Sequence, residues 1–178
     1  MNFWVNKIIP ARDDFQEKVS LKLLKYFDYI SIGFHEFAKE FPLEFINNTE
    51  KHKKISKFYL EKLNDWFSKP EYKGQILNFI CEMQINDIVL IPLTKQYNQD
   101  IYFVRIESDC INIAKNEMLK TLTDSQILGF ARKVKVLYKC TYDNLPENLK
   151  IMKNYPRTNK NYNEKTQIIL DFLDSKIL

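Results

Sequence analysis

The stretch Ile101-Tyr102-Phe103-Val104-Arg105-Ile106-Glu107 decides the fold class of this chain. It is rich in β-branched and aromatic residues, which is typical of a buried strand. Residues 87–93 (Asp-Ile-Val-Leu-Ile-Pro-Leu) form a similar run, with a polar turn at 97–100, and residues 110–114 add a short one. Residues 131–142 alternate charged and apolar side chains, as a half-exposed strand does. The second half of the chain therefore predicts a cluster of strands.

Helical patterns lie on both sides of this cluster. Apolar residues recur at helical spacing in residues 13–26, 48–68, 75–83 and 166–177, with Pro70 ending the second of these segments. Two further strands are expected at residues 2–9 and 29–34. This order of elements predicts an α+β fold in one domain spanning 1–178, with a helical insertion at about 48–83 and a C-terminal helix at 166–177.

Composition narrows the class of protein. Of the 178 residues, 45% are hydrophobic, 28% are charged and only three are glycine, so no glycine-rich phosphate loop can be assembled. No secretory signal or membrane-spanning run is visible. Cys81, Cys110 and Cys140 are far apart and odd in number, which predicts buried free thiols in a cytoplasmic protein.

Two motifs resemble a known family. Residues 1–10, Met-Asn-Phe-Trp-Val-Asn-Lys-Ile-Ile-Pro, resemble the M-x-[YF]-W-x-x-K-x-x-P opening of EVE domains, which belong to the PUA-like barrel superfamily. Residues 83–93 and 131–137 resemble strands of the EVE/PUA-like modules attached to Mrr-type, type IV-like restriction systems. The chain departs from that pattern at three positions: Asn86 replaces a glycine and still suits a left-handed turn, Lys133 replaces a proline, and Val136 replaces an aromatic residue.

The resemblance implies a small PUA-like β-barrel flanked by helices. It also implies a module that reads a flipped, modified DNA base in an aromatic pocket, as the specificity part of a restriction or defence system. Such a module needs no cofactor or metal, and its partners would be modified DNA and an effector nuclease or other protein. The effector would be encoded nearby or lie outside this chain, which is either a complete small protein or an N-terminal domain.

Base readers combine flat apolar walls with a few donors and acceptors aimed at the base edge. Gly33 is expected at a bulge or a close approach of backbone, and strand alternation places Phe103 and Arg105 on one face and Tyr102 and Val104 on the other. The candidate pocket residues are Trp4, Lys7, Gly33, Phe34, Trp66, Phe103 and Arg105.

Basic residues concentrate in the last third of the chain. Residues 1–119 carry 16 Lys and Arg against 17 Asp and Glu, whereas residues 120–178 carry 11 against 6. A basic region of this kind can contact phosphates, and the competing interpretation is a solvated strand face. The candidate phosphate-backbone contacts are Arg132, Lys133, Lys135, Lys139 and Arg157.

No pattern in the chain assembles a catalytic mechanism. His35 and His52 are the only histidines, and neither a zinc-binding spacing nor a nucleophile elbow is present. The sequence therefore favours a binding module over an enzyme. Two alternatives stay open: an RNA-binding module of the same fold, and a protein-interaction adaptor that does not bind nucleic acid.

Overall fold

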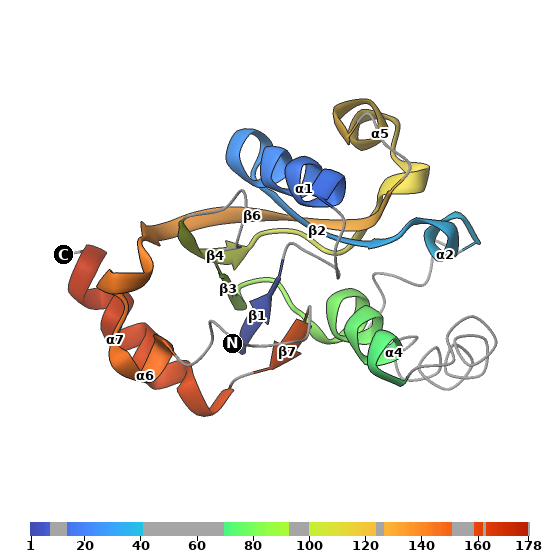
Figure 1. Ribbon diagram of the computed structural model, residues 1–178. Helices are drawn as coiled ribbons and strands as arrows, with labels where there is room; N and C mark the ends of the chain where they lie inside the picture. Colours follow the sequence, from blue (N-terminus) through green and yellow to red (C-terminus); the bar gives the residue numbers. More distant parts are fainter. Residues whose placement is uncertain are drawn as a thin grey trace.

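The computed structural model describes residues 1–7, 14–40, 70–92, 100–123, 127–150, 159–161 and 163–177. Its centre is a seven-stranded sheet curled into a half-barrel, with helices at its flanks (Figure 1). The strand order is β2-β6-β4-β3-β1-β7, and β5 pairs with β6. The strands are β1 (Phe3–Asn6), β2 (Tyr29–Phe34), β3 (Ile88–Ile91), β4 (Ile101–Ile106), β5 (Ile111–Asn112), β6 (Leu128–Cys140) and β7 (Asn159–Asn161). The fold is therefore mixed α+β.

Most neighbouring strands are antiparallel, but β1 runs parallel to β3, with Trp4 opposite Val89. Parallel pairing needs a long crossover. Here the crossover includes α1 (Asp14–Phe27), β2, α2 (His35–Glu40), α4 (Pro70–Leu77) and the π-helical turn η2 (Asn78–Glu82). The remaining elements are η3 (Ile113–Lys115), α5 (Glu117–Thr123), η4 (Tyr142–Asn144), α6 (Glu147–Lys150), η6 (Asn163–Lys165) and α7 (Thr166–Ile177).

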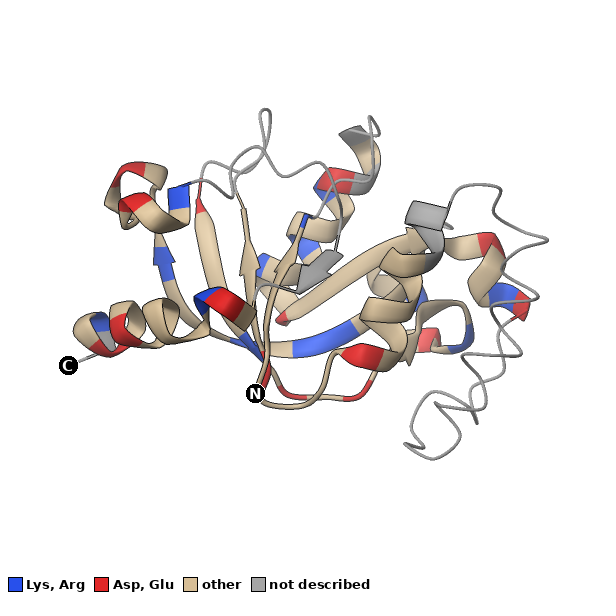
Figure 2. Ribbon diagram, turned by 90° about the horizontal axis from the view of Figure 1, so that it is seen from below, with Lys and Arg blue, Asp and Glu red and all other residues tan. Residues whose placement is uncertain are grey.

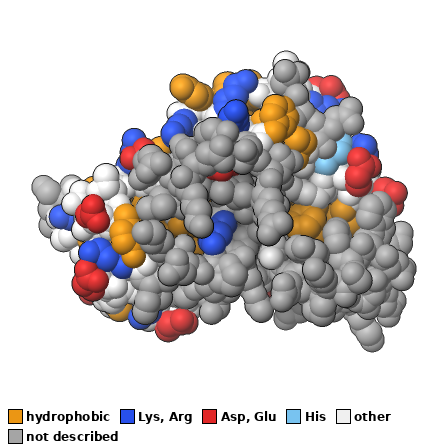
Figure 3. Space-filling view, in the orientation of Figure 1, with side chains coloured by type: hydrophobic (Ala, Val, Ile, Leu, Met, Phe, Trp, Pro, Cys, Tyr) orange, Lys and Arg blue, Asp and Glu red, His pale blue; other side chains and the backbone are white. Residues whose placement is uncertain are grey.

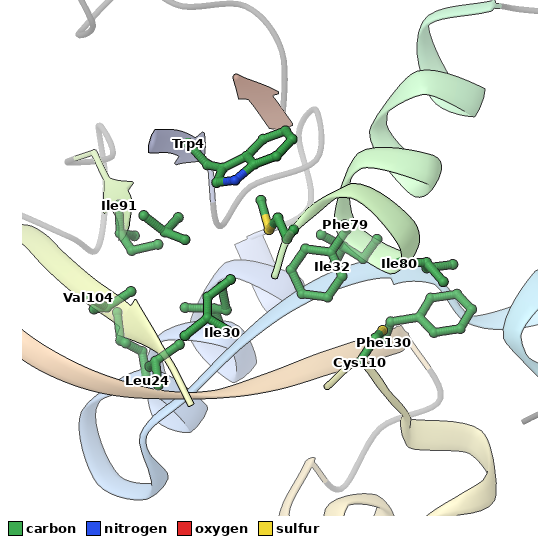
Figure 4. Packing of buried hydrophobic residues seen from close by; sticks show 14 of the residues in the cluster. Trp4, Leu24, Ile30, Ile32, Phe79, Ile80, Ile91, Val104, Cys110 and Phe130 are labelled. Carbon is green, nitrogen blue, oxygen red and sulfur yellow. The ribbon is translucent and has the colours of Figure 1, made fainter. Parts of the chain in front are cut away.

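The two faces of the curled sheet bury different cores. The concave face holds the largest cluster, in which Trp4, Val89 and Val104 pack with residues of α1, α2, α4 and η2 (Figure 4). The convex face at the other end of the strands packs Phe103 and Cys140 against α6 and α7. A third cluster joins α1, η3 and α5 to β2 and β6. Side chains that alternate along one strand therefore enter separate cores.

Several predicted elements are confirmed. The strand at 29–34 is β2, the helix at 13–26 is α1 displaced by one residue, and the helix at 166–177 is α7. The strands expected at 87–93 and 101–107 are β3 and β4, each shorter than predicted. The expected strand at 2–9 is β1 for the residues described, and the predicted helix at 48–68 lies outside the described residues.

Other predictions need correction. The helix expected at 75–83 begins earlier, at Pro70, and becomes a π-helical turn from Asn78. The expected strand at 110–114 is only two residues long before η3, and β6 begins at Leu128 rather than at 131. The short elements α2, α5 and β7 were not predicted, because each spans too few residues for a repeating hydrophobic pattern to be recognised.

Among the described residues, left-handed backbone occurs at three non-glycine positions, Asp28, Phe34 and Asn86. Asp28 (φ 59°) follows the last residue of α1 and ends that helix. Asn86 (φ 73°) completes the turn before β3, as the sequence predicts, because asparagine tolerates this conformation better than most residues. Phe34 (φ 66°) is a strained conformation for a bulky side chain at the junction of β2 and α2.

Gly33 lies in β2 opposite Gly129 of β6, between the pairs Ile32–Phe130 and Phe34–Leu128. A Cβ atom placed on Gly129 would lie 2.5 Å from the carbonyl oxygen of Gly33 and 2.8 Å from that of Phe34. The expected close approach at Gly33 is therefore between two strands of the sheet. No helix in the described ranges has the length and apolar character needed to cross a membrane.

The substitution Gly129→Ala is expected to lower the free energy of unfolding by about 1–3 kcal/mol, because two backbone carbonyls must move to admit the methyl group. Gly74→Ala is the matched control, since Gly74 lies within α4 with nothing within 4 Å of an added Cβ. That control should be neutral or slightly stabilising, because alanine favours helix more than glycine does. Urea unfolding of both variants measures the difference, and equal midpoints would contradict the close approach.

Candidate ligand-binding faces

A buried carboxylate ties the N-terminal strand to the sheet. Asp87 accepts hydrogen bonds from the backbone nitrogen of Asn2 (2.6 Å), from Trp4 Nε1 (2.9 Å) and from the backbone nitrogen of Gln84 (3.0 Å). The bonds from Asn2 and Trp4 connect residues more than eighty positions apart, and the second of them uses the only donor of the indole ring. Trp4 is 3% exposed and belongs to the concave core. The structure therefore gives the expected pocket tryptophan a packing role, with its ring enclosed by core side chains.

Arg132 is also buried. It is 2% exposed, and its guanidinium donates to the carbonyl oxygens of Phe79 (2.8 Å), Ile80 (3.0 Å) and Ser108 (3.1 Å). Burial lowers the pKa of this side chain. Its Nε, Nη1 and Nη2 groups all donate hydrogen bonds to carbonyl oxygens inside the protein. Arg132 is therefore not the phosphate contact that the sequence predicted.

The predicted pocket residues do not converge on one site. Trp4 lies on the concave face, while Phe103 is buried on the convex face against Tyr138 and Phe172. The predicted alternation along β4 is confirmed, since Tyr102 and Val104 enter the concave core. Gly33 is buried in β2 and the half-buried Phe34 packs at the edge of the concave core. Trp66 and Arg157, also predicted for the site, lie outside the described residues.

Three of the candidate cations that the structure describes lie on the convex face. Arg105 pairs directly with Lys135 across β4 and β6, and Lys133 lies two residues further along β6 on the same face. We call Arg105, Lys133 and Lys135 the basic strip. Both lysines are exposed, and the strip lies between Ala131, which packs under α1 and α5, and Tyr138, which packs under α7. The helices therefore leave this part of the sheet uncovered.

Arg105 has an unused donor within the strip. Its side chain is 40% exposed and lies 3.6 Å from the Glu107 carboxylate through Nη2. Its Nε atom is shielded from solvent and has no hydrogen-bond partner among the described residues. A guanidinium held in this way can donate to a further acceptor without breaking an existing bond. Basic and acidic positions are otherwise interspersed along the described ribbon (Figure 2), and basic side chains lie in several separate places on the face shown in Figure 3.

A second polar group of residues lies at one end of the concave face. Tyr102 pairs with Lys139, whose ammonium contacts Asp100 at 2.8 Å and lies 5.6 Å from the centre of the Tyr102 ring. Burial raises the pKa of Tyr102, and the hydrogen bond to Asp100 raises the pKa of Lys139. Lys139, a predicted phosphate contact, is exposed but already paired. Asn6 of β1 lies on this same face and is fully buried.

Burial of Lys7, which follows Asn6, lowers the pKa of its ammonium, because partial desolvation disfavours the charge. This predicted pocket residue therefore lies at the same end of β1 as Asn6. Sequence reasoning missed Asn6 itself. The available signal was a polar amide two residues after Trp4, on the buried face of an otherwise apolar strand.

The three cysteines are buried thiols of low reactivity. All three are free and buried, as predicted. Burial raises the pKa of Cys81 to about 11 and that of Cys110 to about 12, so both remain protonated thiols at neutral pH. Within the described ranges, no three His, Cys, Asp or Glu side chains are grouped so that they could hold a metal ion.

Comparisons with known proteins identify no relative of this chain. No family model matches the chain, and no curated protein or solved structure is similar to it.

The substitution Arg132→Gln is expected to lower the free energy of unfolding by about 2–4 kcal/mol, because buried carbonyls lose their charged donor. Lys133→Gln is the matched control at the adjacent, exposed position, where the change should stay within about 0.5 kcal/mol. Denaturant unfolding monitored by tryptophan fluorescence measures both. A harmless Arg132→Gln would show that the guanidinium does not hold these elements together.

Proposed function

We propose that this chain is a nucleic-acid-binding reader of the PUA-like kind, which recognises a modified base in DNA as the specificity part of a restriction or defence system. In this proposal the chain binds and does not itself catalyse a reaction. The resemblance of residues 1–10 and 83–93 to EVE-type motifs supports it. The curled half-barrel sheet is compatible with it, since a barrel of this kind offers an interior face and an exterior face for separate tasks.

The observation that carries the proposal is the basic strip. Arg105, Lys133 and Lys135 share one uncovered face of two paired strands, and Arg105 keeps a shielded donor without a partner in the described part of the chain. Cations arranged along an exposed strand suit an extended polyanion, because each phosphate contact releases counterions and adds affinity. Such contacts position a polymer without reading its sequence, so recognition of the base requires a second group.

The direct test compares DNA duplexes that differ in one base. Plain duplexes and duplexes carrying methylated or hydroxymethylated cytosine or adenine are titrated at low and moderate salt, beside single-stranded and structured RNA. Tighter binding to one modified duplex supports the reader. Equal binding to all duplexes removes the modified-base part of the proposal, preference for RNA moves it to an RNA-binding module, and absence of binding at low salt favours a protein-interaction domain.

The double variant Lys133→Gln/Lys135→Gln is expected to weaken DNA binding uniformly across sequences. The slope of log K against log salt should become shallower by roughly 2, since about 0.9 is lost for each phosphate contact removed. The control Lys22→Gln/Lys25→Gln removes the same charge from exposed positions of α1 and should leave the slope nearly unchanged. Equal effects of the two variants would mean that net charge, rather than the strip, drives binding.

A further inference from the structure

The side-chain amide of Asn6 is buried without a hydrogen-bond partner among the described residues. The residue is 0% exposed, and neither its Nδ2 nor its Oδ1 atom has a hydrogen-bond partner among the described residues. Burying an unpaired amide is costly, so such groups are rare in folded proteins and each calls for an explanation. Here both the donor and the acceptor of one side chain are left open together.

The position of Asn6 is defined by the sheet. Trp4 lies two residues earlier on the same, concave face of β1, and Ile91 continues the row on β3, since Val5 pairs with Leu90. Ile91 pairs in turn with Tyr102. Figure 4 shows Trp4 and Ile91 pointing into the interior of the curled sheet. The open amide is therefore bordered by an indole, an aliphatic side chain and, one strand further, a phenol.

A planar amide beside flat apolar walls matches one class of ligand well. Asparagine forms paired hydrogen bonds with ring edges that present an adjacent donor and acceptor, as the edges of nucleobases do. Apolar and aromatic walls accept the faces of such a ring, and the two amide atoms provide its orientation.

We propose that Asn6 reads the hydrogen-bonding edge of a nucleobase inserted at this end of the concave face. The inference rests on the proposed function and deepens it, because it assigns recognition to the concave face and phosphate contacts to the convex strip. It also accounts for a polar residue at a position where the strand alternation calls for an apolar one.

The substitution Asn6→Leu separates recognition from folding. Leucine keeps a similar volume and removes the open amide, so the variant should unfold at a higher temperature and denaturant midpoint than the native chain. The same variant should lose roughly 10- to 100-fold of the preference for the favoured base, the range expected for one paired contact. A variant that keeps its base preference, or that unfolds earlier because a buried water satisfied the amide, overturns the inference.

Asn116→Ala is the matched control. The Asn116 side chain accepts a hydrogen bond from the backbone nitrogen of Leu119 at the start of α5, far along the chain from Asn6. Loss of this cap should lower stability while leaving base preference unchanged. The two variants are thus expected to move stability in opposite directions, and only Asn6→Leu should alter recognition. Loss of base preference in both would trace the effect to general destabilisation and overturn the assignment to Asn6.

Titration with single nucleosides distinguishes this inference from the proposed function. The side-chain amide signals of Asn6, assigned by their absence from Asn6→Leu, are followed by NMR with adenosine, N6-methyladenosine, cytidine, 5-methylcytidine and thymidine. A selective shift supports the inference even if the chain binds no polymer, which would instead refute the DNA reader. Binding of DNA with no shift and no effect of Asn6→Leu overturns the inference and leaves the reader intact.

Discussion

The buried guanidinium of Arg132 is the constraint on which the arrangement of the sheet and the π-helical turn η2 depends. A helix leaves its last carbonyl groups without intrahelical partners. In the π-helical turn η2, the carbonyl oxygens of Phe79 and Ile80 accept hydrogen bonds from the Arg132 guanidinium. The carbonyl oxygen of Cys81 accepts one from the Gln84 side chain at 3.0 Å. The third bond of Arg132, to Ser108, reaches the loop after β4. One side chain on β6 thus joins an element more than fifty residues earlier to the far end of the neighbouring strand.

The bonds of Arg132 hold η2 against the concave face, and the Asp87 bonds hold β1 beside β3. Both use a charged group inside the protein, where hydrogen bonds to charge are stronger and the penalty for losing them is larger. The concave face therefore carries the largest buried cluster. The convex face differs, because α7 covers only the end of the strands near Phe103, while α1 and α5 cover the region near Ala131. The lysines of β6 are left between them.

The division of the two faces changes how the candidate residues are understood. Trp4 and Arg132 are the most distinctive side chains of the resembling motifs, yet both serve the core. Two of the described residues that do have unfulfilled hydrogen-bonding capacity are less conspicuous: Asn6, through its side-chain amide on one face, and Arg105, through its Nε on the other. A protein selected only for stability would gain from an apolar side chain at Asn6. Stability alone therefore does not explain Asn6, and the proposed nucleobase would supply the missing partners.

The sequence by itself determined the kinds of elements and much of their order. The alternation of β4, the helical period of α1 and α7, the left-handed turn at Asn86 and the buried thiols all follow from local patterns. Element ends and the short segments α2, α5 and β7 escaped prediction, since a few residues carry too little periodicity. Only the tertiary structure decided which side chains remain available for a ligand. Exposure depends on what packs against each face, and the partners of Trp4 and Arg132 include Asp87 and Phe79, each more than fifty residues away.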